Sequence, residues 1–142
     1  MKEPVWIRLD AAQAMHDEAL RLHGGPEGVR DLGLLESALD RPKNLFAYSR
    51  PLPSLAQLAA AYAYGVVANH PFADGNERAA FIISITFLRL NGVCLTAAKE
   101  DRVLTFWKLA DGSLTQGQLA EWFDRSSAPC PAHPADRPVR VG

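Results

Sequence analysis

Two long helical patterns separated by a short polar break constrain the fold of this chain more than any other feature. Ser54 and Gln57 form a capping-box pattern, which predicts an alanine-rich helix from there to about Asn69. A second long helix is predicted from about Asn76 to a stop at Gly92, with apolar residues at helical spacing: Ala79, Ala80, Ile83, Phe87 and Leu90. The polar break must therefore lie where two central helices meet.

The segment before these helices is also predicted to be helical. Asp10 is expected to cap a helix that runs to about Leu22. Asp31 is expected to cap a shorter helix that stops near Pro42. Residues 42–53 hold three prolines, and this composition predicts a loop or a small flap.

The segment after them continues the helical pattern. A short extended piece at residues 93–97 precedes helices predicted near 99–110 and 115–125. Residues 126–142 are rich in proline and lack apolar periodicity, which predicts a flexible tail. We therefore expect one compact all-α domain over residues 1–125, followed by that tail.

Composition excludes several classes of function. A formal net charge of -1 gives no electrostatic reason to expect direct nucleic-acid binding. The longest apolar stretch, residues 79–90, is too short and too polar to span a membrane, and the N-terminus lacks the apolar core of a signal peptide. Cys94 and Cys130 fit no metal-ligand pattern and are not expected to form a disulfide. These features predict a cytoplasmic protein.

The polar break carries the residues most suited to chemistry. It runs from His70 to Arg78 and has the sequence HPFADGNER. The first N–H groups of a helix have no intrahelical partner and lie at the positive end of the dipole, so this position suits phosphate oxygens. An imidazole beside it could accept a proton from an attacking hydroxyl. Pro71 favours an extended backbone at His70.

Each neighbour of His70 admits two roles. Asp74 could hold Mg²⁺ bridged to phosphates, or it could cap the next helix. Gly75 would let the backbone approach a ligand closely, and Asn76 could bind phosphate or cap the helix. Arg78 opposes the helix dipole unless an anion compensates it, whereas Glu77 suits a helix N-terminus but would repel a phosphate.

The motif HPFADGNERAAF resembles the signature loop of the Fic/Doc family, H-x-F-x-D/E-G-N-x-R. The segments GGPEGVRDLGLLESALDRP and FLRLNGVCLT resemble parts of the death-on-curing (Doc) branch that flank this loop. The resemblance covers roughly residues 10–125, and it implies a compact all-helical domain with the loop between two central helices. It also implies a flap, which aligns a target segment, within residues 44–53.

The resemblance implies a role for each residue of the loop. His70 would be the catalytic base, and Asp74 would be the Mg²⁺-associated acid. Gly75 and Asn76 would form the anion-binding turn, and Arg78 would contact the phosphates of ATP or another nucleoside triphosphate. Glu77, which lies between them, belongs to the same predicted phosphate-binding turn.

Two positions depart from the pattern of the family. AMP-transferring members carry an arginine where this chain has Phe81, and Doc-like members carry lysine where it has Glu77. The leading hypothesis is a toxin that transfers a phosphoryl group to a hydroxyl of a target protein such as a translation elongation factor, with an antitoxin as partner. The alternatives are an AMP transferase and a catalytically weakened binding protein.

Two residues outside the loop have open roles. His16 lies on the first predicted helix, and a histidine in a similar place lies near the groove in the Doc branch. A structural, half-buried histidine is the alternative. Arg30, in the sequence GVRD, could support the site or belong to the cap of the second helix.

Overall fold

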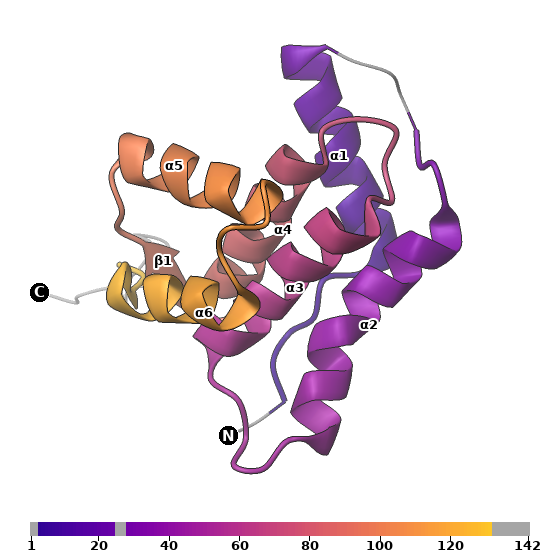
Figure 1. Cartoon of the computed structure of the whole chain (residues 1–142). Helices are drawn as coiled ribbons and strands as arrows, with labels where there is room; N and C mark the ends of the chain where they lie inside the picture. Colours follow the sequence, from indigo (N-terminus) through magenta and orange to yellow (C-terminus); the bar gives the residue numbers. More distant parts are fainter. Residues whose placement is uncertain (1–2, 25–27, 132–142) are drawn as a thin grey trace, which may run out of the picture.

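The computed structural model describes residues 3–24 and 28–131, and these form six α-helices and two short strands (Figure 1). In chain order they are α1 (Leu9–His23), α2 (Leu32–Tyr48), α3 (Leu55–Asn69), α4 (Asn76–Leu90), β1 (Val93–Leu95), α5 (Lys99–Ala110), α6 (Gln116–Arg125) and β2 (Ser127–Pro129). The predicted all-α architecture is confirmed, with one small two-stranded sheet added. None of the described helices is long and apolar enough to cross a membrane.

Helix α3 forms the centre of the fold and packs against α2, α4 and α6. The predicted capping box is present: the N–H of Gln57 donates to Oγ of Ser54, and the N–H of Ser54 donates to Oε1 of Gln57. Gly65 allows α2 and α3 to approach closely, since a Cβ at this position would lie 3.2 Å from the carbonyl oxygen of Ala38. Small residues on α3 thus hold the central helices close together.

A buried tyrosine ties the N-terminal segment to this centre. The phenol oxygen of Tyr62 accepts a hydrogen bond of 2.9 Å from the N–H of Ile7. Burial raises the pKa of Tyr62 to about 12. The ring of Trp6 stacks on Phe87 of α4, at 5.8 Å between ring centroids. The segment before α1 is therefore held on α3 and α4 together.

Two predicted helix boundaries are wrong. Helix α1 begins beyond Arg8 without a side-chain cap, and Asp10 lies within its first turn. Helix α2 does not stop at Pro42 but continues to Tyr48, while the cap at its start is Asp31, as predicted. Pro42 is fully buried, so packing offsets the hydrogen bond that a proline removes from a helix. The predicted flap is reduced to the short connection between α2 and α3.

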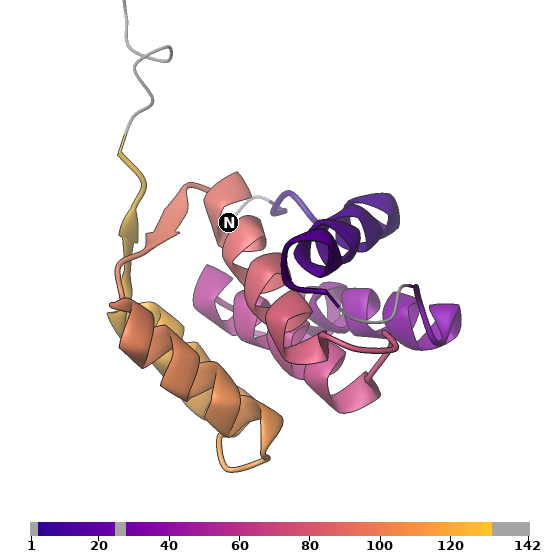
Figure 2. The same ribbon diagram turned by 90° about the horizontal axis from the view of Figure 1, so that it is seen from above.

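The C-terminal end of the described chain returns to the strand after α4. Strands β1 and β2 pair antiparallel, with Cys94 opposite Ala128. Cys94 forms a disulfide with Cys130, with Cα atoms 4.9 Å apart. The prediction of unpaired cysteines is therefore wrong. The predicted tail begins with an ordered strand, and residues 132–142 lie outside the described residues. Figure 2 shows this ribbon at one side of the helices.

Candidate active site

The loop between α3 and α4 begins with a backbone reversal at His70. This residue caps α3 in the left-handed conformation, with φ 54° and ψ 53°, and its N–H donates to the carbonyl of Val66 at 3.0 Å. The extended conformation predicted from Pro71 is therefore wrong. A left-handed non-glycine residue is uncommon, and it persists only where its surroundings hold it in place.

The segment before α2 provides that support. The N–H groups of Arg30 and Asp31 both donate to the carbonyl of Pro71, and Val29 forms a β-bridge with Phe72. The guanidinium of Arg30 donates to the carbonyl of His70. Arg30 thus supports the loop, one of the two roles left open by the sequence, while Asp31 caps α2 through a bond from the N–H of Leu34.

The amide of Asn76 fastens the loop from inside. Its Oδ1 accepts from the N–H of Phe72 at 3.0 Å, and its Nδ2 donates to the carbonyl of Phe72 at 3.0 Å. Nδ2 also lies 2.9 Å from Nδ1 of His70. Asn76 is 5% exposed. Its side chain is therefore committed to the loop, so phosphate binding by its amide and capping of α4, the two predicted roles, are not what the structure shows.

These bonds determine the tautomer of His70. Oδ1 of Asn76 accepts from the N–H of Phe72, and Nδ2 of Asn76 donates to the carbonyl of Phe72. The amide therefore has only one orientation that satisfies both bonds, and Nδ2 is the atom next to His70. Nδ1 of His70 must then accept from Nδ2, and the neutral ring carries its proton on Nε2. The His70 side chain is exposed, so this Nε2–H is available to a ligand.

A second histidine holds the loop from α1. Nε2 of His16 lies 2.8 Å from the carbonyl oxygen of Asp74, and the ring stacks on Phe72 at 3.8 Å between centroids. His16 is 1% exposed and Phe72 is fully buried. His16 is thus a buried supporting residue, more deeply buried than the half-buried alternative. Sequence spacing could not indicate that contact, because α1 is far from the loop along the chain.

Helix α4 begins directly after this loop. Gly75 stands at its N-cap in the left-handed conformation, with φ 75°, and α4 has no side-chain cap within the described residues. The prediction that Asp74 or Asn76 caps α4 is therefore wrong. The carboxylate of Asp74 and the guanidinium of Arg78 are exposed, and within the described residues neither forms an ion pair. The first N–H groups of α4 are available to an anion.

A pocket of ≈ 760 Å³ opens beside this helix start. Its volume falls within the range of small-molecule sites. One wall comes from the loop and the first turns of α4, and the other comes from α5. The lining residues are Gly24, Val67, His70, Asp74, Gly75, Asn76, Glu77, Arg78, Phe81, Lys99, Arg102, Val103, Phe106 and Ala110. All six loop residues singled out in the sequence therefore line one pocket.

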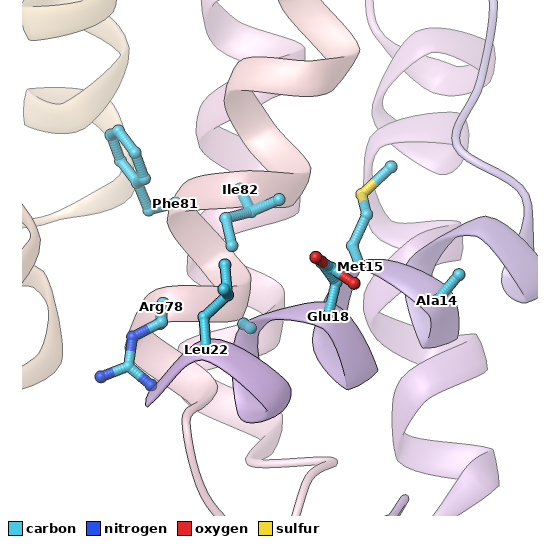
Figure 3. Close-up of a pocket in the computed structure, with 8 residues that line it drawn as sticks. Ala14, Met15, Glu18, Leu22, Arg78, Phe81 and Ile82 are labelled. Atoms are coloured by element: carbon cyan, nitrogen blue, oxygen red, sulfur yellow. The ribbon is translucent and has the colours of Figure 1, made fainter. Parts of the chain in front are cut away.

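A second, more apolar pocket of ≈ 530 Å³ lies between α1 and α4 (Figure 3). Met15 and Leu22 of α1 line it together with Ile82 of α4. Arg78 borders both pockets. In Figure 3 its guanidinium lies at the edge of the apolar pocket, beside Leu22.

The fold and the loop define a class of helical proteins in which a histidine, a carboxylate and an arginine surround the N-terminus of a central helix. The model of the Fic/DOC family matches residues 6–88. The chain belongs to the Fic/Doc family.

Two relatives can be compared in detail. Toxin Doc of Mycolicibacterium smegmatis is 42% identical over 74 residues, which is 52% of this chain and 57% of that toxin. The protein named Protein kinase doc of Escherichia phage P1 is 30% identical over 112 residues, or 79% of this chain and 87% of that protein. The similarity thus extends well beyond the loop.

Proposed function

We propose that this chain is a toxin that transfers a phosphoryl group from a nucleoside triphosphate, such as ATP, to a hydroxyl group of a target protein. The observation that carries this proposal is the single pocket lined by His70, Asp74, Arg78 and the uncapped start of α4. Two relatives support the proposal by their names: Toxin Doc supports the role as a toxin, and Protein kinase doc supports the transfer of a phosphoryl group to protein. A translation elongation factor is the proposed target and an antitoxin is the proposed partner. The cytoplasm is the proposed location because this target lies there, although a disulfide such as that between Cys94 and Cys130 is uncommon in that compartment.

The start of α4 would hold the phosphates of the nucleotide. The N–H groups of its first turn have no intrahelical partner, and the helix dipole favours negative charge there. The guanidinium of Arg78 would neutralise a phosphate oxygen and so remove the unfavourable placement of a cation at a helix N-terminus. Because Gly75 has no side chain, a phosphate could lie directly on the backbone.

His70 would accept the proton of the target hydroxyl at Nε2. The tautomer held by Asn76 carries a proton on that atom, so the base needs the other tautomer and gives up the bond from Asn76. A neutral hydrogen bond contributes about 1 kcal/mol, which corresponds to roughly a fivefold loss of rate. General base catalysis raises the rate on the order of 10²- to 10⁴-fold, which is much more than the loss caused by the exchange of tautomer.

Asp74 would hold Mg²⁺ together with the phosphates. One exposed carboxylate facing a phosphate site fits this ion, because Mg²⁺ keeps several waters and takes one or two carboxylates. When bound, the ion would neutralise charge on the phosphates. His16 holds the carbonyl of Asp74 and so fixes the position of the residue.

The test is a transfer assay with His70→Asn as the inert variant. Asparagine tolerates the left-handed backbone of position 70 better than alanine does, so the loop is retained while the imidazole is removed. The purified chain is incubated with a cell extract and with ATP labelled at the γ or the α position. We expect γ label on a protein, absent with His70→Asn. Label from the α position would instead support AMP transfer.

A weakened binding protein is the second candidate, because the carboxylate of Glu77 lines the same pocket. This candidate predicts that no label is transferred from either position. It also predicts that Glu77→Lys, which restores the cation of Doc-like relatives, produces transfer in the same assay.

A further inference from the structure

An arginine on α5 faces the start of α4 across the pocket. Arg102 lines the pocket together with Lys99, on the wall opposite the loop. Among the described residues, Nε of Arg102 is buried and has no hydrogen-bond partner. A buried donor without a partner costs on the order of 1–3 kcal/mol, so such an atom calls for an explanation.

The guanidinium of Arg102 is held over an aromatic ring. Its Cζ lies 5.8 Å from the centroid of the Phe81 ring, within the range of a cation–π contact. Phe81 is itself fixed by an edge-to-face contact with Phe106, at 5.1 Å between centroids. In Figure 3 the Phe81 ring lies on the side of α4 away from Met15, and Phe81 borders the apolar pocket as well as the larger one.

The helix that carries Arg102 is anchored. Oδ2 of Asp101 accepts a bond of 3.1 Å from Nε1 of Trp122 on α6, and Phe106 is packed among the aromatic rings of α6. The neighbour of Arg102 is thus tied to α6, and this tie fixes the face of α5 that is turned to the pocket.

The cations of α5 reverse the formal charge of the side chains that line the pocket. Its loop side carries the carboxylates of Asp74 and Glu77 and one cation, Arg78, which sums to -1. Lys99 and Arg102 add two positive charges and bring the sum to +1. A phosphate chain between the two walls would therefore be bound more strongly with the cations of α5 than without them.

We infer that Arg102, assisted by Lys99, binds the outer phosphates of a nucleoside triphosphate from the α5 side of the pocket. AMP-transferring members of the family carry an arginine at the position of Phe81. In this chain Arg102 of α5 lies over the Phe81 ring and would supply a guanidinium at that place. The inference rests on the proposed function for the kind of ligand, and it adds a phosphate-binding residue outside the signature loop.

The test measures binding of ATP, adenosine and inorganic tripolyphosphate to the full chain by calorimetry, in the presence of Mg²⁺. Arg102→Met is compared with Arg102→Lys, which keeps the charge, and with Lys108→Met on the exposed face of the same helix. We expect Arg102→Met to weaken ATP and tripolyphosphate binding about 10- to 100-fold, the range of a charge-assisted hydrogen bond. Adenosine binding should stay unchanged, Arg102→Lys should recover part of the loss, and Lys108→Met should match the unmodified chain.

Several outcomes would overturn the inference. Unchanged ATP and tripolyphosphate binding by Arg102→Met would show that the guanidinium does not bind phosphate. An equal loss of adenosine and ATP binding would assign Arg102 to the base or to packing, and circular dichroism of the variant separates these two. Arg102-dependent tripolyphosphate binding without any transfer to protein would support the inference and contradict the proposed function instead.

Discussion

The guanidinium of Arg30 donates two hydrogen bonds to the carbonyl oxygen of His70, from Nε at 2.9 Å and from Nη2 at 2.7 Å. Nη2 also donates to the carbonyl of Asn69 at 3.3 Å. The last carbonyl groups of α3 are therefore satisfied by a side chain from the segment before α2. The orientation of the histidine thus depends on a residue remote in sequence.

Removing this support should change turnover more than nucleotide binding. In Arg30→Met the carbonyl groups of Asn69 and His70 lose a charged donor, at a cost of about 1–3 kcal/mol in the free energy of unfolding. We expect kcat for transfer to fall roughly tenfold, while KM for ATP changes less than twofold, because a misplaced base affects the transition state. Lys43→Met on the exposed face of α2 is the control. A roughly tenfold rise in KM for ATP without a fall in kcat would contradict this role.

The side chain of Asn76 should contribute to the stability of the fold. Asn76→Ala leaves the N–H and the carbonyl of Phe72 without partners in a buried place, so the free energy of unfolding should fall by roughly 2–4 kcal/mol. Urea denaturation measures this loss, with the exposed Asn44→Ala as the control. A loss below about 0.5 kcal/mol would show that water replaces the amide.

Reduction of the disulfide should destabilise the chain. The bond closes a segment with a sequence separation of 36, for which the chain-entropy relation gives roughly 3–4 kcal/mol. We expect thermal unfolding of the oxidised chain to lose several degrees on addition of a thiol reductant. The variant Cys94→Ser should start at the lower value and show no response to the reductant. An identical midpoint for the oxidised and reduced chains would contradict this estimate.

Alkaline pH should weaken the fold through Tyr62. The pKa of this phenol is raised from 10 to about 12 by burial, so the unfolded chain releases the proton first. Its contribution is largely complete below pH 10 and is lost as the pH rises toward 12, by about 1 kcal/mol between pH 10 and pH 11. Tyr62→Phe loses the bond from Ile7 and should be less stable at pH 7, but its stability should fall less between pH 10 and 11. Urea midpoints at each pH test the sign.

Local signals made the central part of the fold predictable. The capping box at Ser54 and the helix stop after Leu90 depend on neighbouring residues only, and the structure contains both. Pro42 shows the limit of such rules, because the burial that keeps it inside α2 comes from helices elsewhere in the chain. The pairing of Cys94 with Cys130 likewise depends on the return of the chain beside β1.

In the candidate site too, the residues that are contiguous in sequence were predictable and the contacts from other elements were not. The loop residues from His70 to Arg78 were found because they are contiguous in sequence. Their support was not predictable in detail, because His16 and Arg30 reach the loop from other elements and Arg102 reaches the pocket from α5. The left-handed backbone at His70 follows from those contacts rather than from Pro71.

The covalent closure of the C-terminal ribbon has a consequence for the wall of the pocket that α5 forms. Helices α5 and α6 lie between Cys94 and Cys130, so the disulfide ties both ends of this unit at one point beside α4. If the packing of this unit on the rest of the chain opens briefly, the disulfide keeps α5 and α6 within one closed ring, which limits the conformations that the unit can adopt. Lys99 and Arg102 would then return to the loop as part of that ring.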